Sequence, residues 1–410
     1  MSHPAPSADG ERVLSDLNAL RAIGAYESGV HKPTFSAPHL ASLQWLVAKL
    51  PDAGLTGAID GIGNVLGKSA KPGPKLLAGS HLESQNHAGW LDGPLGVVYA
   101  LEAARVLNTN PAIPGSVEVA AWCDEEGHFG HFLGSRSYVG GVTDADIDAA
   151  ADRTSGRSMR EALNAAGLAG VARQTAERGR HIGYLEAHIE QGRTLESEGL
   201  KIGVVTSIVG IWQYRITFTG EQNHAGTTRM AERKDAGLAL AKFCVGIDER
   251  FPKLCGPRTV WTTGRITLEP GAPSIIPGRA EMLFQIRDAD IAVVTRLEAA
   301  LTEMADEVNA QARCTVRVEC IRKGRPAMMD GKFQAAIEAA SASLASGKSL
   351  RMPSGAGHDA QVLATIMPAG MLFVPSIGGI SHHWTENTSD EDIVTGVQVF
   401  VEACRRLLTQ

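Results

Sequence analysis

The chain has 410 residues, 44% hydrophobic and 20% charged, with a formal net charge of -6. This composition is typical of a globular protein, and the length exceeds what one core usually fills, so we expect two domains. The negative charge, without any block of Lys or Arg, excludes a nucleic-acid surface. Because no apolar run reaches the length of a membrane span and the start lacks a signal-peptide pattern, we expect no membrane association and a cytoplasmic protein.

Helical and strand-like patterns alternate through the first part of the chain. Apolar residues spaced by three or four predict helices within residues 8–50, and two short strands are expected around the turn-rich residues 60–64. The apolar run 75–78 predicts a strand and residues 94–107 a helix. Alternation in SVEVAAW, residues 116–122, predicts a buried strand.

Polar residues follow these predicted strands. His81 and Asp92 lie in the Gly-rich stretch after the first, and Asp124, Glu125 and Glu126 follow the second directly. Adjacent carboxylates repel one another unless a cation or protons compensate, and imidazole with carboxylate suits a divalent metal. A hydrogen-bonded turn and a solvated acidic turn are the structural alternatives, but the repeated strand-then-loop order favours a functional site.

The segment from Tyr184 to Gly192, YLEAHIEQG, has helical spacing. A helix here would place Glu186 away from His188 and turn Leu185 and Ile189 toward the core. A single His beside an apolar face is also compatible with a hydrogen-bonded core residue, so the pattern alone leaves a ligand role for His188 open.

A change of pattern marks an inserted domain at residues 207–321. Its expected elements are strands at 212–219, 259–268, 279–286 and 314–320, with helices at 230–251 and 291–311. This βαββαβ order is the ferredoxin-like arrangement, an antiparallel sheet with helices on one face. The fold class is therefore α/β: a discontinuous catalytic domain, residues 1–206 and 322–410, with a mixed sheet flanked by helices, plus this insertion, whose exposed sheet edge suits dimerisation.

The order of the motifs identifies a family. SHLES…LDGPLG, CDEEG, EAHIEQG, NHAGTTRMAERKDA, SGAGHDA and GGISHHWTE follow one another along the chain. In this order they resemble the amidase/hydantoinase/carbamoylase branch of the M20 metallopeptidase-like hydrolases, which includes N-carbamoyl-L-amino-acid hydrolases and allantoate amidohydrolases. The resemblance covers nearly the whole chain and implies a homodimer.

For the metal centre, the resemblance implies two divalent metals bridged by Asp92. His81 and His188 would complete one site, and Glu126 and His382 the other; manganese, zinc, nickel and cobalt all remain open. Two cations that share a water lower its pKa.

The remaining implied roles concern the base and the substrate. Glu125 would be the general base, which takes the proton of the water and hands it to the departing nitrogen. His224 would donate to the oxyanion, and in relatives the corresponding His reaches the active site of the partner subunit. The expected substrate contacts are Arg287 for an α-carboxylate, together with Gln191, Ser274, His224 and His358. A turn-capping role for His224 and a structural role for His358 stay open.

Departures from the family pattern bear on the substrate. The usual H-x-D is His81-Leu82-Glu83 here, and Ser274 replaces the usual Asn before V-I-P. With the aromatic and imidazole side chains around the site (His87, Trp90, His383 and Trp384), these changes predict a bulkier or more aromatic substrate than a simple carbamoyl amino acid. The expected function is hydrolysis of a linear amide or ureido bond in a small carboxylate-bearing substrate, with an N-carbamoyl-L-amino acid leading. An N-acyl amino acid or aromatic amide hydrolase, a dipeptidase and a catalytically silent binding protein are the alternatives.

Overall fold

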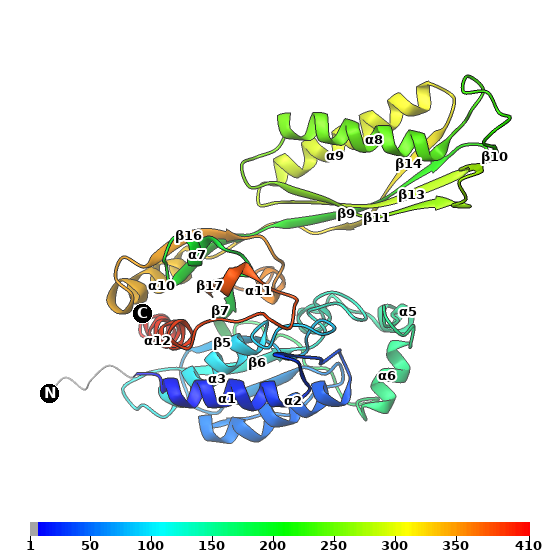
Figure 1. Ribbon diagram of the computed structural model, residues 1–410. Coiled ribbons are helices and arrows are strands. Elements are labelled where there is room, and N and C mark those ends of the chain that lie inside the picture. Colours follow the sequence, from blue (N-terminus) through cyan, green and yellow to red (C-terminus); the bar gives the residue numbers. More distant parts are fainter. Residues whose placement is uncertain (1–6) are drawn as a thin grey trace. The chain divides into compact units, whose positions relative to one another are not determined.

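The computed structural model describes residues 7–410 and divides into two compact units (Figure 1). Residues up to Thr206 together with Met328–Gln410 form unit 1, and Ser207–Ala327 form unit 2. The insertion was expected to end at residue 321, but unit 2 continues to Ala327 because its last strand runs on to Lys323. None of the helices within residues 7–410 combines the length and apolar character needed to cross a bilayer.

A nine-stranded mixed sheet forms the middle of the described part of unit 1, in the order β15-β8-β17-β7-β5-β6-β4-β3, with β16 beside β8. Its strands are β3 Leu55–Thr56, β4 Val65–Ser69, β5 Lys75–His81, β6 Ser116–Trp122, β7 His181–Ile189, β8 Ile202–Ile208, β15 Ala327–Met328, β16 Ser349–Ser354 and β17 Ala369–Val374. Strands β6, β5, β7 and β17 are parallel, and β4 and β8 pair with this group in antiparallel orientation. The predicted α/β class with a mixed sheet is confirmed.

Helices flank this sheet, as the sequence predicted (Figure 1). The larger ones are α1 Gly10–Ala22, α2 Ala37–Lys49, α3 Pro94–Asn108, α10 Gly331–Leu344 and α12 Asp390–Leu408; the shorter ones are α4 Leu133–Tyr138, α5 Asp144–Ala149, α6 Met159–Ala165, α7 Thr194–Ser197 and α11 Asp359–Leu363. Helix α3 packs on β5, β6 and β7, and α12 packs on α3 and α10. Gly93 precedes α3 with φ 85°, and a Cβ there would lie 2.4 Å from the His81 ring, so only Gly allows the helix to begin this close to the imidazole.

Unit 2 is a four-stranded antiparallel sheet in the order β11-β13-β9-β14 with two long helices. Its elements are β9 Gly210–Thr219, α8 Ala236–Arg250, β11 Val260–Glu269, β13 Arg279–Asp288, α9 Ile291–Ala310 and β14 Thr315–Lys323, with the small pair β10 Asn223–His224 and β12 Ile275–Ile276. The chain order is the βαββαβ order expected from the sequence. Strand β9 alternates between buried and partly exposed residues, which places one sheet face against the helices.

Two local expectations were wrong. Residues 184–192 do not form a helix, because His181–Ile189 is the strand β7. From residue 183 onward this strand is buried on both faces, so it lacks the alternation that usually reveals a strand. The helix expected to begin at Met230 begins at Ala236, where the side chain of Asp235 accepts the Leu238 N–H at 2.9 Å and caps it.

Candidate metal centre

The candidate metal centre forms where the central parallel strands of unit 1 end. His81, which ends β5 rather than lying in the following loop, is in register with Trp122, the last residue of β6. His188, near the end of β7, is in register with Phe373 of β17. Because parallel strands end at the same edge of a sheet, the loops that follow β6 and β17 begin beside these two histidines.

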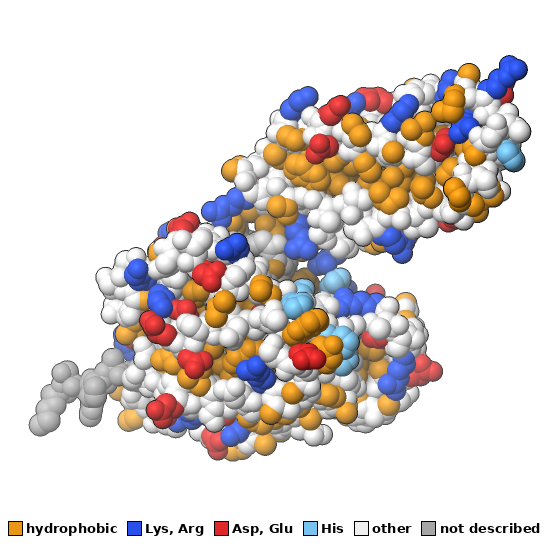
Figure 2. Space-filling view, in the orientation of Figure 1, with side chains coloured by type: hydrophobic (Ala, Val, Ile, Leu, Met, Phe, Trp, Pro, Cys, Tyr) orange, Lys and Arg blue, Asp and Glu red, His pale blue; other side chains and the backbone are white. Residues whose placement is uncertain are grey.

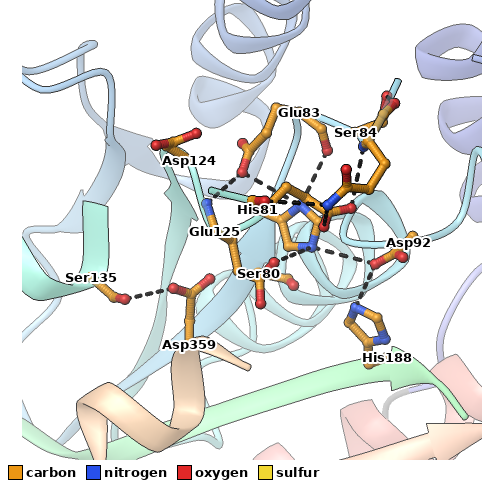
Figure 3. A network of polar contacts seen from close by, with 12 residues as sticks. Ser80, His81, Glu83, Ser84, Asp92, Asp124, Glu125, Ser135, His188 and Asp359 are labelled. Atoms are coloured by element: carbon orange, nitrogen blue, oxygen red, sulfur yellow. Dashed lines mark hydrogen bonds and ion pairs between the residues drawn. The ribbon is translucent and has the colours of Figure 1, made fainter. Parts of the chain in front are cut away.

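His81, Asp92 and His188 form a first group of buried donors (Figure 3). Nε2 of His188 lies 3.0 Å and Nε2 of His81 lies 3.5 Å from Asp92 Oδ1. Each imidazole donates its Nδ1–H to a backbone carbonyl, that of Glu83 at 3.1 Å and that of Ile189 at 3.0 Å. When the two rings are neutral, both Nε2 atoms therefore carry the lone pair and face Asp92, and Nε2 of His81 is buried without a hydrogen-bond partner. This donor set fits a divalent transition metal.

Asp92, Glu126 and His382 form a second group. Nε2 of His382 lies 3.3 Å from Asp92 Oδ2 and 3.7 Å from Glu126 Oε2. The Asp92 carboxylate thus turns Oδ1 to the first group and Oδ2 to the second, which is the geometry of a carboxylate that bridges two cations. The second group is the more open one, because the side chain of His382 is 50% exposed.

Negative charge accumulates in this buried space. Burial raises the pKa of Glu125 well above its ordinary value and also raises the pKa of Glu126. Burial alone would raise the pKa of Asp92 as well, but His188 and the other facing imidazoles hold it well below its usual range. Burial lowers the pKa of His382, yet contact with Asp92 outweighs this and raises it to about 9. Protons on the imidazoles or divalent cations must balance these carboxylates.

Asp124, the first carboxylate of the acidic cluster, closes a loop and does not face either donor group. It is fully buried with φ 59° and accepts a hydrogen bond from Thr34 Oγ1 at 2.7 Å. The backbone N–H groups of residues 128–130 donate to it at 2.7–3.0 Å. Burial raises the pKa of Asp124 to about 7.

Glu125 lies next to the first donor group (Figure 3). Its Oε2 is 3.8 Å from Nε2 of His81, and its side chain is 11% exposed. Its backbone N–H donates to Glu83 Oε1 at 2.6 Å, which fixes the peptide that carries the side chain. The predicted base therefore meets the first requirement of a general base, a position within reach of a molecule held between the donor groups.

Asp92 is supported by residues for which the sequence predicted no role. Oε1 of Glu386 accepts the N–H groups of Asp92 at 3.1 Å and Leu91 at 3.3 Å, and Ser381 donates to Glu386 Oε2 at 2.9 Å. Burial raises the pKa of Glu386 to about 8. Glu386 is the last residue of the motif GGISHHWTE and lies four residues after His382. This position was the only indication of its role in the sequence. Gln191, predicted to contact substrate, donates to Asp92 Oδ2 at 2.9 Å.

His358 lies beside the first group but outside it. Its ring meets the ring of His188 edge to face at 4.6 Å, and its Nε2 is 2.9 Å from Ser354 Oγ. Burial lowers its pKa well below the ordinary value, so it is a neutral neighbour of a ligand.

The other predicted substrate residues belong to unit 2. Nδ1 of His224 accepts the N–H groups of Gly226 at 3.0 Å and Thr227 at 3.2 Å, which is the turn-capping geometry left open by the sequence. Ser274 is next to His224 through β10 and β12, since its carbonyl accepts the Ala225 N–H at 3.0 Å.

Several known proteins are similar to this chain in sequence or fold. Residues 73–406 match the model of peptidase family M20/M25/M40. An N-carbamoyl-L-amino-acid amidohydrolase of Paenarthrobacter aurescens is 35% identical over 98% of both chains. An allantoate amidohydrolase of Bacillus subtilis is 33% identical over 90% of this chain and 92% of its own. The crystal structure of an amidase of the hydantoinase/carbamoylase family from Burkholderia phymatum has 44% identity and a TM-score of 0.90 over 99% of both chains.

These names confirm the predicted enzyme class, hydrolases acting on carbon–nitrogen bonds other than peptide bonds in linear amides. They also agree with the motifs from which the resemblance was inferred. The chain belongs to peptidase family M20/M25/M40, and its resemblance to the hydantoinase/carbamoylase branch is confirmed.

Proposed function

We propose that the chain hydrolyses a linear amide or ureido carbon–nitrogen bond in a small substrate that carries a carboxylate, most specifically an N-carbamoyl-L-amino acid. The observation that carries this proposal is the pair of donor groups that share Asp92, with Glu125 beside them. Two similar proteins, an N-carbamoyl-L-amino-acid amidohydrolase and an allantoate amidohydrolase, support a ureido substrate.

The two donor groups fit two divalent cations, which we assign as the cofactor. His81 and His188 would hold the first, Glu126 and His382 the second, and Asp92 would bridge them. Mixed nitrogen and oxygen donors suit manganese, zinc, nickel or cobalt. Bound there, the cations would lower the pKa of a water molecule and polarise the substrate carbonyl.

Glu125 is the proposed general base. Its Oε2 accepts a proton from the attacking water and returns it to the departing nitrogen, which leaves as an amine or ammonia. Burial supports this role, because it raises the pKa of Glu125 well above its ordinary value and so makes the carboxylate a stronger base.

His224 is the proposed donor to the oxyanion. Since its Nδ1 accepts two backbone N–H groups, the neutral ring carries its proton on Nε2. That nitrogen is therefore a hydrogen-bond donor, as stabilisation of a tetrahedral oxyanion requires.

The substrate carboxylate and amide need separate partners. Arg287 on β13 is the proposed carboxylate anchor, because burial lowers the pKa of its guanidinium and a bound anion would offset that cost. Ser274, whose carbonyl accepts the Ala225 N–H next to His224, is a second proposed substrate contact. In unit 1, Oε1 of Gln191 is buried without a partner, and a ureido N–H would satisfy it. His358 is better supported as a positioning neighbour of His188 than as a substrate contact.

We further propose a homodimer formed through unit 2. Strand β11 lies at the edge of the sheet and is exposed along nearly its whole length, including Val260, Ile266 and Leu268. Leu238 and Val245 of α8 are exposed as well, and Figure 2 shows hydrophobic side chains spread over the visible surface of unit 2. An unpaired edge strand of ten residues is an aggregation risk in a monomer, and pairing with a second copy would remove it.

A second candidate, hydrolysis of an aromatic amide or N-acyl amino acid, is favoured by a cluster of stacked rings. His87 stacks on Tyr26 at 4.1 Å and on His31 at 4.5 Å, and Trp384 stacks on His383 at 4.0 Å and meets Tyr26 at 5.9 Å. Figure 2 shows histidine side chains gathered with hydrophobic ones on the visible face of unit 1.

This ring cluster belongs to the same chain segments as the ligands. His87 lies five residues before Asp92, and Trp384 two residues after His382. A planar substrate side chain would find aromatic surface there, and an aromatic pair contributes about 0.5–1.5 kcal/mol beyond its buried area.

The test is ammonia release from N-carbamoyl-L-amino acids, allantoate and ureidoglycolate by chelator-treated protein, with and without added Mn²⁺. We expect metal-dependent release, with carbamoyl phenylalanine or tryptophan preferred over carbamoyl alanine, and loss of that preference in His87→Ala. Release of carboxylate from N-acyl or aromatic amides, with the ureido panel silent, would replace the first candidate by the second. Silence on every substrate by protein without stoichiometric metal would indicate a catalytically silent binding protein.

A further inference from the structure

Gln85 holds the carboxylate of Glu126, a proposed ligand of the second metal site, in place. Nε2 of Gln85 donates to Glu126 Oε2 at 2.6 Å and to the Glu126 carbonyl at 3.2 Å, and its backbone N–H reaches Oε1 at 3.2 Å. Glu126 is only 5% exposed, so few other groups compete for its oxygens. The orientation of the Gln85 amide therefore decides which lone pairs of the Glu126 carboxylate are free to bind a cation.

Arg153 fixes the orientation of that amide. Its Nη2 donates to Gln85 Oε1, and its Nη1 donates to the Glu126 carbonyl at 3.2 Å. With its oxygen bound to a guanidinium, the Gln85 amide can turn only its NH₂ group toward Glu126. Arg153 makes no ion pair with a carboxylate among residues 7–410, so its charge is directed at these neutral acceptors.

The loop that carries Arg153 is itself attached next to the site. The Arg153 N–H donates to the His128 carbonyl at 2.9 Å, and Asn86 donates to Thr154 Oγ1 at 3.2 Å. The loop closes on itself through the Asp152 N–H, which donates to the Arg157 carbonyl at 2.8 Å. None of these loop residues lies in a motif that identified the family.

We infer that Arg153 is a positioning residue for the second metal site, acting through Gln85 on Glu126. Without it, the Gln85 amide can rotate and turn its oxygen toward the carboxylate, which repels Glu126 from its ligand position. Residues that orient metal ligands typically contribute a factor of 10–100 to metal affinity. The inference rests on the two-metal centre of the proposed function and is independent of the substrate.

The experiment compares Arg153→Ala with wild type and with Arg157→Ala as the matched control. Arg157 lies in the same loop but donates to the Glu161 carbonyl at 2.9 Å, away from the ligands. Binding of Mn²⁺ or Co²⁺ to chelator-treated full-length protein is measured by calorimetry, and the visible spectrum of the Co²⁺ form reports ligand geometry. We expect Arg153→Ala to weaken one of two sites about 10- to 100-fold and leave the other unchanged.

Two further variants separate positioning from general damage. Arg153→Lys, which keeps a donor, is expected to restore part of the affinity, and Gln85→Ala to lower it as Arg153→Ala does. The double variant should lose no more than either single one, because both residues act on Glu126 in series.

The result that overturns the inference is an Arg153→Ala protein that binds two metals as wild type does. Equal weakening of both sites, or the same loss in Arg157→Ala, would overturn it too, since either indicates a general disturbance of the loop. A wild-type protein that binds no metal would instead overturn the proposed function, and the role of Arg153 with it.

Discussion

Glu118 of strand β6 contacts His181 of strand β7, which also carries His188. Replacing Glu118 tests the electrostatics of the fold. It lies on β6 with a side chain 2% exposed, and it accepts hydrogen bonds from the Ser69 N–H at 2.9 Å and from Arg180 Nη2 at 2.7 Å and Nε at 3.0 Å. Nε2 of His181, at the start of β7, is 2.9 Å from Oε2. Although burial opposes it, His181, Arg180 and the backbone donor lower the pKa of Glu118 to about 2.

The sign and size of the effect follow from this pKa. Because the folded pKa is below the unfolded value of 4.5, ionised Glu118 stabilises the fold above pH 4.5, and this contribution is lost as pH falls from 4.5 toward 2. A shift of this size corresponds to at most about 3 kcal/mol at pH 7, falling to about half of that at pH 3. Glu118→Gln should therefore lower the free energy of unfolding by up to about 3 kcal/mol at neutral pH.

Urea unfolding of both proteins between pH 3 and 7 measures this difference. Glu177→Gln is the matched control, since Glu177 also pairs with Arg180, at 3.2 Å, but is 54% exposed and should contribute under about 1 kcal/mol. A Glu118→Gln protein as stable as wild type at pH 7, or a difference that does not shrink toward pH 3, would refute the reasoning.

Further predictions concern the metal centre and assembly. Glu125→Gln should keep both metals but lose about 10²–10⁴-fold in kcat; retained turnover would remove Glu125 from the role of base. Asp92→Asn should bind neither metal at wild-type affinity in calorimetric titration, and wild-type binding at both sites would contradict the bridging role. His224→Ala should lower kcat about 10²–10³-fold at unchanged metal content; an unchanged kcat would leave only the turn-capping role. Ile266→Lys, which places a charge on the exposed edge strand, should give a monomer by light scattering if β11 forms the dimer, and an unaltered mass would exclude that surface.

The residues that the motifs named as metal ligands come together in two groups that share Asp92. His81, Glu126 and His382 each lie at or just after a strand, and parallel strands bring such positions to one edge whatever the intervening residues are. The proposed bridging role of Asp92 was inferred from the family pattern alone. The strand at residues 116–122 was predicted with its observed bounds.

The other features of the fold and the site depend on tertiary contacts, which the spacing of residues along the sequence does not reveal. Strand β7 looked helical because burial on both faces removes its alternation. Gln85 and Arg153 act across 68 residues of chain, and neither has a neighbour in sequence that marks it. Asp124 was grouped with the other two carboxylates, yet a left-handed backbone conformation turns it into the loop.

Glu83 illustrates how the fold absorbs a departure from the family motif. In the family motif, the Asp at this position is expected to orient the ring of His81. Here the ring instead donates its Nδ1–H to the backbone carbonyl of Glu83, at 3.1 Å. The carboxylate is therefore available elsewhere: Oε1 accepts the Glu125 N–H at 2.6 Å, and Oε2 lies 3.6 Å from Nε2 of the buried His39. The Glu83 side chain therefore binds the peptide of Glu125, the proposed base, and helps to fix its position. The ring of His81, a proposed metal ligand, is oriented by the main chain.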